Sequence, residues 1–169
     1  AWEPGCVELW RAQDGVETRL AVCVPPGADA ELRRLTLVNR SDRPRRLEVT
    51  TCVEVVLLEP AAHAAHPAFG KLFLETESDG GRRALFARRR PRAAGERHPW
   101  LVHALVADAQ PGRHEFETDR ARFLGRRPAG GVPGTLAAGG PLSGTTGAVL
   151  DPVLRSEEHT SELQSHHPI

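Results

Sequence analysis

The sequence has no methionine, no tyrosine, a single lysine and only three cysteines among its 169 residues. The missing initiator methionine predicts an internal fragment of a longer protein. No apolar run approaches the roughly 20 residues of a membrane-spanning helix, and the N-terminus lacks the features of a signal peptide. Cys6, Cys23 and Cys52 are odd in number and form no C-x-x-C pair. This pattern predicts neither a disulfide framework nor a thiolate zinc site, and it indicates a reducing compartment.

Charge of either sign is not in excess, because 22 basic and 22 acidic side chains give no formal net charge at pH 7. Domains that bind nucleic acid by neutralising phosphates are usually strongly basic. The balance therefore argues against a nucleic-acid partner. Apolar residues make up 40% of the chain, which is enough for one domain with a buried core.

The dominant pattern that is present is an alternation of apolar and polar residues with a period of two. It is clear in residues 16–24, and residues 46–59 continue it over an unusual length, with a second half that is apolar on both faces. We therefore expect residues 46–59 to form an inner strand covered on both sides. Further strands are predicted at residues 35–38, 71–76, 84–87, 101–107, 114–118 and 148–150. Without a helical period beyond two turns, the predicted fold class is all-β, with antiparallel sheets packed face to face.

The last third of the chain changes character twice. Glycine and proline dominate from residue 128 to 147, which predicts a long surface loop. Residues 155–166 resemble the in-frame translation of a short-read sequencing adapter. We therefore divide the chain into a partial domain, residues 1–154, and a non-native disordered tail, residues 155–169. A genuine polar tail is the alternative.

Three clusters have side chains suited to chemistry. His63 and His66 have a spacing that could hold a metal on a helical turn, but no acidic or thiol partner lies near, so a connecting loop is the preferred interpretation. Residues 88–92 contain four arginines, which fit a solvated strand end, an anion or sugar site, or a nucleic-acid patch. Glu117 and Asp119 are formal candidates for glycoside chemistry, although ion pairs with nearby arginines are the commoner arrangement. We predict no metal site.

Several short motifs also follow one another in a fixed order and spacing across residues 7–154. They are residues 36–41, 45–50, 54–57, 66–69, 71–73, 75–77, 88–92, 100–103, 117–126, 142–147 and 149–152. Together they resemble the N-terminal β-supersandwich domain of glycoside hydrolase family 94. Within that family the chain is most similar to the cyclic β-1,2-glucan synthases and next to the β-1,2-oligoglucan phosphorylases.

The resemblance implies a galactose-mutarotase-like antiparallel supersandwich, truncated here. In such enzymes a helical linker and an (α/α)6 barrel follow the sandwich, and the barrel supplies the general-acid aspartate. The parent chain is then a glycosyltransferase or inverting phosphorylase that makes or phosphorolyses β-1,2-glucan, with inorganic phosphate as co-substrate and no cofactor. Since the barrel is absent from these residues, we expect this chain alone to be inactive, with no catalytic residue of its own.

The resemblance further implies that the sandwich packs against its own catalytic barrel, takes part in a homodimer of the parent, and lends loops to the glucan cleft. We expect the segment 120–127 and the loop 142–151 to face the barrel. The candidates for lining the substrate cleft are Arg120, Arg122, Phe123, Gly125, Arg126 and Asp151. Arg126→Ala in a full-length homologue is then expected to lower phosphorolysis or the control of product length.

A different class of function remains open alongside this one. The chain could be a stand-alone carbohydrate-binding or structural β-sandwich module, which a stop codon soon after Val153 in the extended gene would favour. The expected location of the parent is the cytoplasm, with the cytoplasmic side of a bacterial inner membrane as an alternative.

Overall fold

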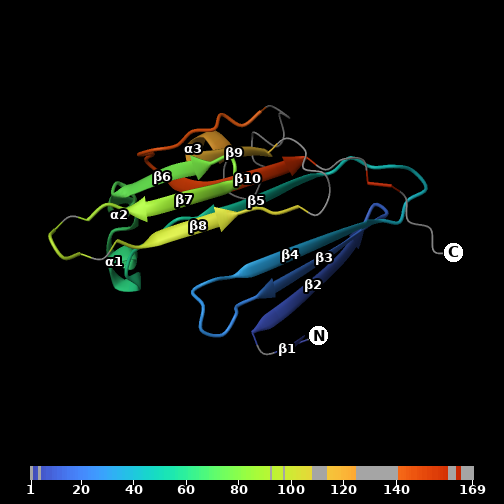
Figure 1. The fold of residues 1–169 in the computed structure, drawn as a ribbon, viewed down its shortest axis with the longest axis horizontal. Coiled ribbons are helices and arrows are strands. Elements are labelled where there is room, and N and C mark those ends of the chain that lie inside the picture. The colour runs from blue at the N-terminus through green and yellow to red at the C-terminus, as the bar shows by residue number, and fades with distance from the viewer. Residues whose placement is uncertain are drawn as a thin grey trace. The chain divides into compact units, whose positions relative to one another are not determined.

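The computed structural model describes residues 2–3, 5–91, 93–96, 98–107, 114–124, 141–159 and 163–164. It divides into two compact units, Ala1–Leu47 with Thr160–Ile169, and Glu48–His159. We call them unit 1 and unit 2 and describe each by itself. Nearly all regular structure in both units is antiparallel β-sheet, as the alternation predicts (Figure 1).

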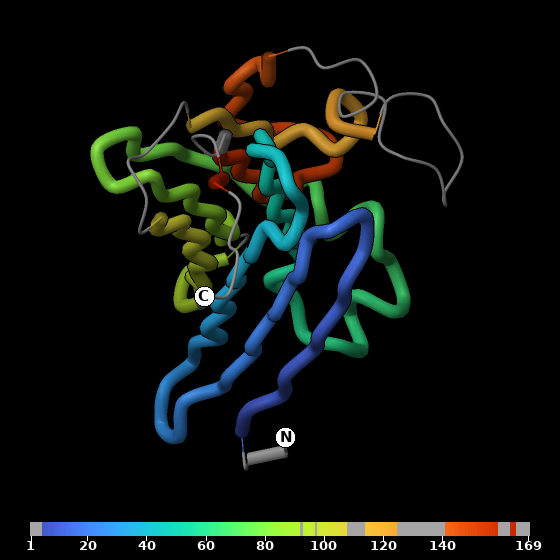
Figure 2. Tube along the Cα trace, turned by 90° about the vertical axis from the view of Figure 1, so that its right-hand side faces the viewer, coloured from blue at the N-terminus to red at the C-terminus, as the bar shows by residue number. Residues whose placement is uncertain are grey.

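Unit 1 contains one four-stranded antiparallel sheet. Its strands follow chain order: β1 (Trp2–Glu3), β2 (Cys6–Gln13), β3 (Val16–Cys23) and β4 (Leu32–Asn39). Figure 2 shows β2, β3 and β4 running back and forth beside one another. Asp14 and Gly15 join β2 to β3 with φ values of 52° and 77°, the two positive values that a tight hairpin turn of type I′ requires.

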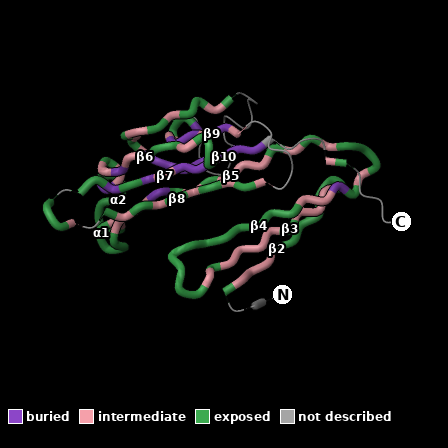
Figure 3. Tube along the Cα trace, viewed as in Figure 1, coloured by how far each residue is buried: buried purple, intermediate pink, exposed green. Residues whose placement is uncertain are grey.

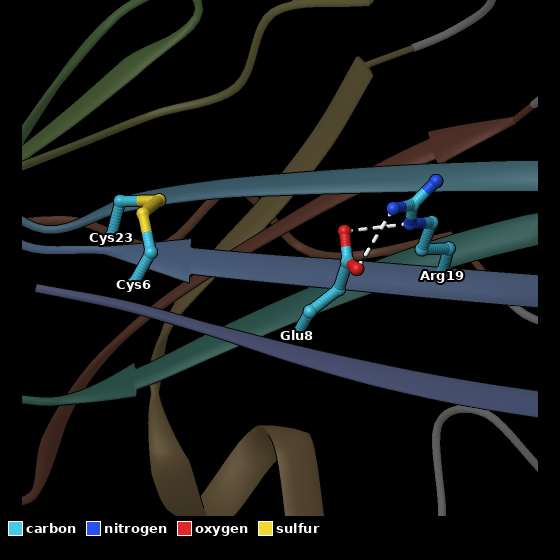
Figure 4. The surroundings of a disulfide bond; sticks show 4 residues. All are labelled: Cys6, Glu8, Arg19 and Cys23. Atoms are coloured by element: carbon cyan, nitrogen blue, oxygen red, sulfur yellow. Dashed lines mark hydrogen bonds and ion pairs between the residues drawn. A yellow bond between two sulfur atoms is a disulfide. The ribbon is translucent and has the colours of Figure 1, made fainter. Parts of the chain in front are cut away.

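A disulfide closes the other end of this hairpin. Cys6 and Cys23 lie directly opposite each other on β2 and β3, with Cα atoms 4.2 Å apart, and their sulfur atoms are bonded (Figure 4). The prediction that the cysteines form no disulfide is therefore wrong for this pair. Cys52 is free. Near the disulfide, Arg19 Nε donates to Glu8 Oε1 at 2.6 Å, and this bond lowers the pKa of Glu8 and raises the pKa of Arg19.

Asn39 ends β4 and organises the turn that follows. Its side chain is buried, its Nδ2 donates to the carbonyl oxygens of Arg43 and Leu163 at 2.8 and 3.0 Å, and its Oδ1 accepts from the backbone N–H of Ser41. This is the local backbone capping expected of an Asn in a turn. The chain therefore turns directly after β4.

Unit 2 contains two three-stranded antiparallel sheets. One has the order β5-β10-β9, formed by β5 (Glu48–Glu54), β10 (Pro152–His159) and β9 (His114–Asp119). The other has the order β6-β7-β8, formed by β6 (Leu74–Asp79), β7 (Ala84–Arg89) and β8 (Trp100–Ala104). Two short helices, α1 (Pro60–Ala65) and α2 (Pro67–Lys71), lie between β5 and β6, and a third, α3 (Arg120–Leu124), follows β9.

The buried core of unit 2 lies between these sheets. It is made by side chains from both of them and from the end of β5: Val55, Leu74, Leu85, Ala87 and Leu154. Figure 3 shows the buried residues concentrated on β6, β7, β9 and β10. Two antiparallel sheets with a shared apolar interior are the face-to-face packing that the sequence predicts.

Three sequence-based boundaries are corrected. The strand predicted at residues 46–59 ends at Glu54, because Leu57 adopts a φ of 46° and α1 begins at Pro60. Within the part of the chain that the structure describes, it also lies at the edge of its sheet rather than inside it. The strand predicted from residue 71 begins at Leu74, after α2. Residues 148–150 form no strand, and the chain enters β10 at Pro152 instead.

The predicted disorder of residues 155–169 is wrong for residues 155–159. These residues belong to β10, which pairs with β5 from Val153↔Glu54 to His159↔Glu48 and with β9 on its other side. The central strand of this sheet therefore includes them. Their non-native origin stays a prediction, because pairing depends on the backbone and not on where a sequence comes from.

Candidate functional site

The predicted cleft residues gather where β9 meets α3. The carboxylate of Asp119 accepts a hydrogen bond from the backbone N–H of Ala121 at 2.9 Å and lies 3.6 Å from Arg122 Nε. The chain therefore turns from strand to helix at this carboxylate, in the way that an N-cap aspartate starts a helix. Arg120 is the first residue of the helix, so its side chain leaves from the turn itself.

Four charged side chains meet beside this turn, and we call them the Asp151 cluster: Glu54, Lys71, Arg120 and Asp151. The two guanidinium nitrogens of Arg120 lie 3.2 Å from Glu54 Oε1 and 3.4 Å from Asp151 Oδ2. Lys71 Nζ contacts the other oxygen of Asp151. The backbone N–H of Arg120 also donates to the Asp151 carbonyl at 3.0 Å. The structure thus brings the two cleft candidates Arg120 and Asp151 together and adds Glu54 and Lys71, which the sequence analysis does not name as candidates.

The Asp151 cluster is accessible to solvent although its members are held in place. Arg120 and Asp151 are 39% and 33% exposed, and Lys71 is 21% exposed. Two cations and two carboxylates leave no net charge at the cluster. It therefore offers hydrogen-bond donors and acceptors side by side, which is what a neutral ligand with many hydroxyl groups needs.

The other candidate residues have different surroundings. Phe123 is only 5% exposed, and the Arg155 guanidinium lies 4.4 Å from its ring centroid, so the ring lies in the interior of unit 2. Arg122 is exposed, and its Nη1 is 3.5 Å from Ser143 Oγ. Gly125 and Arg126 lie outside the described residues.

Glu117 is structural rather than reactive in this arrangement. It is 2% exposed, and its Oε1 accepts hydrogen bonds from the backbone N–H groups of Thr118 and Asp119, each at 2.9 Å. Its Oε2 accepts from the Ser143 hydroxyl. Its hydrogen-bond partners are therefore two backbone amides and a hydroxyl, where the sequence suggested arginines. Both oxygens accept hydrogen bonds and the side chain is buried, so this carboxylate is not exposed to a substrate at the surface.

The loop before Asp151 is attached to unit 2 by backbone and hydroxyl contacts. The N–H of Leu142 donates to Glu115 Oε2 at 2.7 Å, and Thr118 Oγ1 donates to the Thr145 carbonyl at 2.8 Å. Thr76 and Gly147 exchange two backbone hydrogen bonds, at 3.0 and 2.8 Å. These contacts fix the path of the chain up to Asp151, so the position of the cluster follows from β6 and β9.

The arginine-rich segment 88–92 combines exposed and buried side chains. Arg88 and Arg90 both contact Glu75, at 2.9 and 3.3 Å. Arg89 is buried with its guanidinium 5.4 Å from the Phe73 ring centroid, and it lies 3.6 Å from Glu96. All three arginines therefore have carboxylate partners, which fits a strand end better than a site for polyanions.

Metal ligation has no support among the described residues, which contain no group of three or more His, Cys, Asp or Glu side chains able to hold a metal ion. His63 lies in α1 and His66 between α1 and α2, so the connection that was expected to be a loop consists mostly of two short helices. In the same part of the chain, none of the helices is long and apolar enough to cross a membrane.

Burial shifts the pKa of three groups in unit 2. It lowers the pKa of His114, with nearby Arg83 acting in the same direction, and it lowers the pKa of Arg155. It raises the pKa of the Cys52 thiol, with Glu54 adding to the effect. These groups belong to the β5-β10-β9 sheet, and none of the three is a member of the Asp151 cluster. The accessible charges and the perturbed groups are therefore different sets.

Comparison with known proteins identifies the fold. A model of the glycosyl hydrolase 94 supersandwich domain matches residues 2–164. The chain belongs to this family. It is also 37% identical over 127 residues to the cyclic beta-(1,2)-glucan synthase NdvB of Rhizobium meliloti strain 1021, an alignment that covers 75% of this chain and 4% of that protein. The chain thus spans a small part of the relative it matches.

Membership in the family agrees with the two-sheet unit described above. The supersandwich domain is part of a carbohydrate-active enzyme family, and the antiparallel sheets confirm the predicted fold class. The matched range includes the whole of β10.

Proposed function

We propose that this supersandwich domain serves an enzyme that makes or phosphorolyses β-1,2-glucan, by supporting an (α/α)6 catalytic barrel and lining its glucan cleft. The observation that carries the proposal is the Asp151 cluster. Its accessible donors and acceptors suit sugar hydroxyls, and they stand at the β9–α3 turn where the cleft residues are expected. The similarity to a cyclic β-(1,2)-glucan synthase supports the choice of glucan.

The proposal assigns the reaction itself to the barrel. The buried Glu117 carboxylate accepts hydrogen bonds from two backbone amides and a hydroxyl. The Asp119 carboxylate caps the N-terminus of α3. Neither carboxylate is free to act as the general acid of an inverting reaction. Because the Asp151 cluster has no net charge, we place the inorganic phosphate of a phosphorolytic parent at the barrel rather than here. The chain alone is then inactive.

Arg120→Ala in a full-length parent tests the cleft assignment. Loss of a charged donor to a sugar hydroxyl is expected to lower kcat/KM by about tenfold or more. Arg33→Ala is a matched control, since Arg33 is 52% exposed on β4 of unit 1 and pairs locally with Glu31. Equal kcat/KM values for the two variants, with equal melting temperatures, would contradict the assignment of the Asp151 cluster to the glucan cleft.

The inactivity of the chain has its own test. The purified chain, given glucosyl donor and acceptor or glucan and phosphate, is expected to form no product, while the full-length parent does so under the same conditions. Product formation by the chain alone would show that a catalytic acid lies within these residues and would contradict the assignment to the barrel.

A further inference from the structure

The outer face of the β6-β7-β8 sheet carries side chains in ordered rows. Directly paired residues on antiparallel strands share a face, and the register places three such rows on this one. From β8 across β7 to β6 they are Trp100, Arg88 and Glu75; then Val102, Phe86 and Glu77; then Ala104, Ala84 and Asp79. The face is therefore apolar along β8 and acidic along β6. We call it the Trp100 face.

The apolar side of this face is open to solvent. Trp100 is 51% exposed and Val102 is 56% exposed. Large apolar side chains exposed next to each other on an otherwise well-formed sheet mark a contact surface more often than isolated ones do. A tryptophan ring held on a flat strand also offers a broad surface at low cost in conformational entropy.

The polar side of this face is held in a fixed arrangement next to the ring. The Arg88 guanidinium lies 5.6 Å from the Trp100 ring centroid, within the range of a cation–π contact. The same guanidinium is 2.9 Å from Glu75 Oε2 and 3.5 Å from Glu77 Oε1. Ring, guanidinium and carboxylates therefore form one row of polar and apolar groups that needs little ordering on binding.

The charges of this face cancel one another. Its three carboxylates, Glu75, Glu77 and Asp79, pair with three guanidiniums, of Arg88, Arg90 and Arg82. A polyanion or a strongly basic partner gains little from such a surface. The complementary ligand is neutral, has an apolar face for the ring, and has hydroxyl groups for the carboxylates.

We infer that the Trp100 face is a second glucan-binding surface, separate in its residues from the Asp151 cluster. A pyranose ring stacks its C–H face on Trp100, and its hydroxyl groups donate to Glu77. Glu77 is the most exposed of the three carboxylates on this face. The inference rests on the proposed function for the choice of a glucan over other neutral ligands. It would hold a long product chain on the sandwich while the cleft acts on its end.

Affinity electrophoresis tests the inference directly. The chain is run in native gels that contain linear β-1,2-glucan, with gels lacking glucan as the reference. Trp100→Ala is expected to weaken the retardation about tenfold in apparent Kd. Trp10→Ala is the matched control, because Trp10 is a 68% exposed tryptophan on β2 of unit 1, and it is expected to keep wild-type retardation.

Two outcomes overturn the inference. One is the absence of retardation of the wild-type chain by the glucan, and the other is equal retardation of the Trp100→Ala and Trp10→Ala variants. Retardation by polylysine in place of glucan identifies a basic partner and overturns it as well. Glu77→Gln adds a finer readout, since it keeps the size of the side chain while weakening the acceptor, and weaker retardation than wild type supports the hydroxyl contact.

The full-length parent separates this inference from the proposed function. With long glucans as substrate, Trp100→Ala is expected to raise KM several-fold at unchanged kcat, whereas Arg120→Ala lowers kcat/KM for short glucans too. An unchanged KM in Trp100→Ala overturns the second surface and leaves the cleft assignment intact. An effect of Trp100→Ala alone, with Arg120→Ala silent, supports the surface and contradicts the cleft.

Discussion

The two halves of β10 are buried alike but differ completely in chemistry. Val153 and Leu154 are fully buried and apolar, and Leu154 belongs to the core of unit 2. From Arg155 to Glu158 the strand is equally buried, yet three of its four side chains are charged and the fourth is a serine. Burial here is set by the central place of the strand between β5 and β9, and not by the kind of residue that fills it.

The second half of β10 has partners for some of its polar atoms only. Arg155 pairs with Glu157, and Glu158 Oε2 is 3.0 Å from Arg83 Nη1. Ser156 Oγ and Glu158 Oε1 are buried without a hydrogen-bond partner among the described residues. Native strands rarely bury so many polar groups with incomplete partners. The change occurs at residue 155, where the resemblance to a sequencing adapter begins, although the family match continues to residue 164. The division of the chain at this residue stays a prediction.

Glu157→Leu is expected to cause the largest loss, about 3 to 5 kcal/mol of unfolding free energy, because it leaves the buried Arg155 charge without its carboxylate. Urea denaturation measures it. The double variant Arg155→Met with Glu157→Leu removes both charges and is expected to match or exceed the wild-type stability by up to about 4 kcal/mol. A double variant less stable than the single one would mean that the strand depends on these charges, and would contradict a non-native origin.

Leu154→Ala is expected to lower the unfolding free energy by about 2 to 5 kcal/mol, since it opens a cavity in the core between the two sheets of unit 2. Leu150→Ala is the control, because Leu150 is highly exposed, and it is expected to change stability by less than about 0.5 kcal/mol. Similar losses in both variants would show that the apolar half of β10 does not have the core position described.

Ser156→Ala is expected to raise the unfolding free energy by about 1 kcal/mol, because it removes a buried hydroxyl that has no partner. Thr118→Val makes the opposite change at a hydroxyl that does have partners, the Thr145 carbonyl and the Thr76 hydroxyl, and is expected to lose about 1 to 2 kcal/mol. Paired thermal melts compare them. A loss in both variants would assign Ser156 a contact that stabilises the fold.

Lowering the pH is expected to have the smallest effect, acting through His114 next to the charged half of β10. Burial holds the pKa of His114 below its ordinary value near 6.5. The folded state therefore favours the neutral ring, and this stabilisation is present above about pH 6.5 and is lost as the pH falls below it. Melting curves of the wild type and His114→Gln at pH 7.5 and 5 measure the difference, and equal slopes would exclude His114.

Local patterns in the sequence were sufficient for much of the fold. The alternation in residues 16–24 and 114–118 matches β3 and β9 closely. The hairpin carries a further local signal. A two-residue turn at Asp14 and Gly15 places Cys6 opposite Cys23 by counting outward equally from the turn, so the disulfide could have been predicted from the hairpin.

The candidate site was predictable only in part. Arg120 and Asp151 came from the family resemblance, and the structure brings them within 3.4 Å. Lys71 and Glu54 lie far from both in sequence, on α2 and at the end of β5. No local period or motif connects them to Asp151. Such contacts depend on which strands pair, and strand pairing is a non-local property of the chain.

The sequence and the tertiary structure determined different properties of this protein. By itself the sequence determined the all-β class, most strand positions and the family, because a period of two and ordered motifs are local properties of the chain. Tertiary structure decided that β10 is central, that Cys6 meets Cys23, and that residues 155–158 are buried. Alternation specifies which face a side chain takes, but only the pairing of distant strands decides what lies beside it.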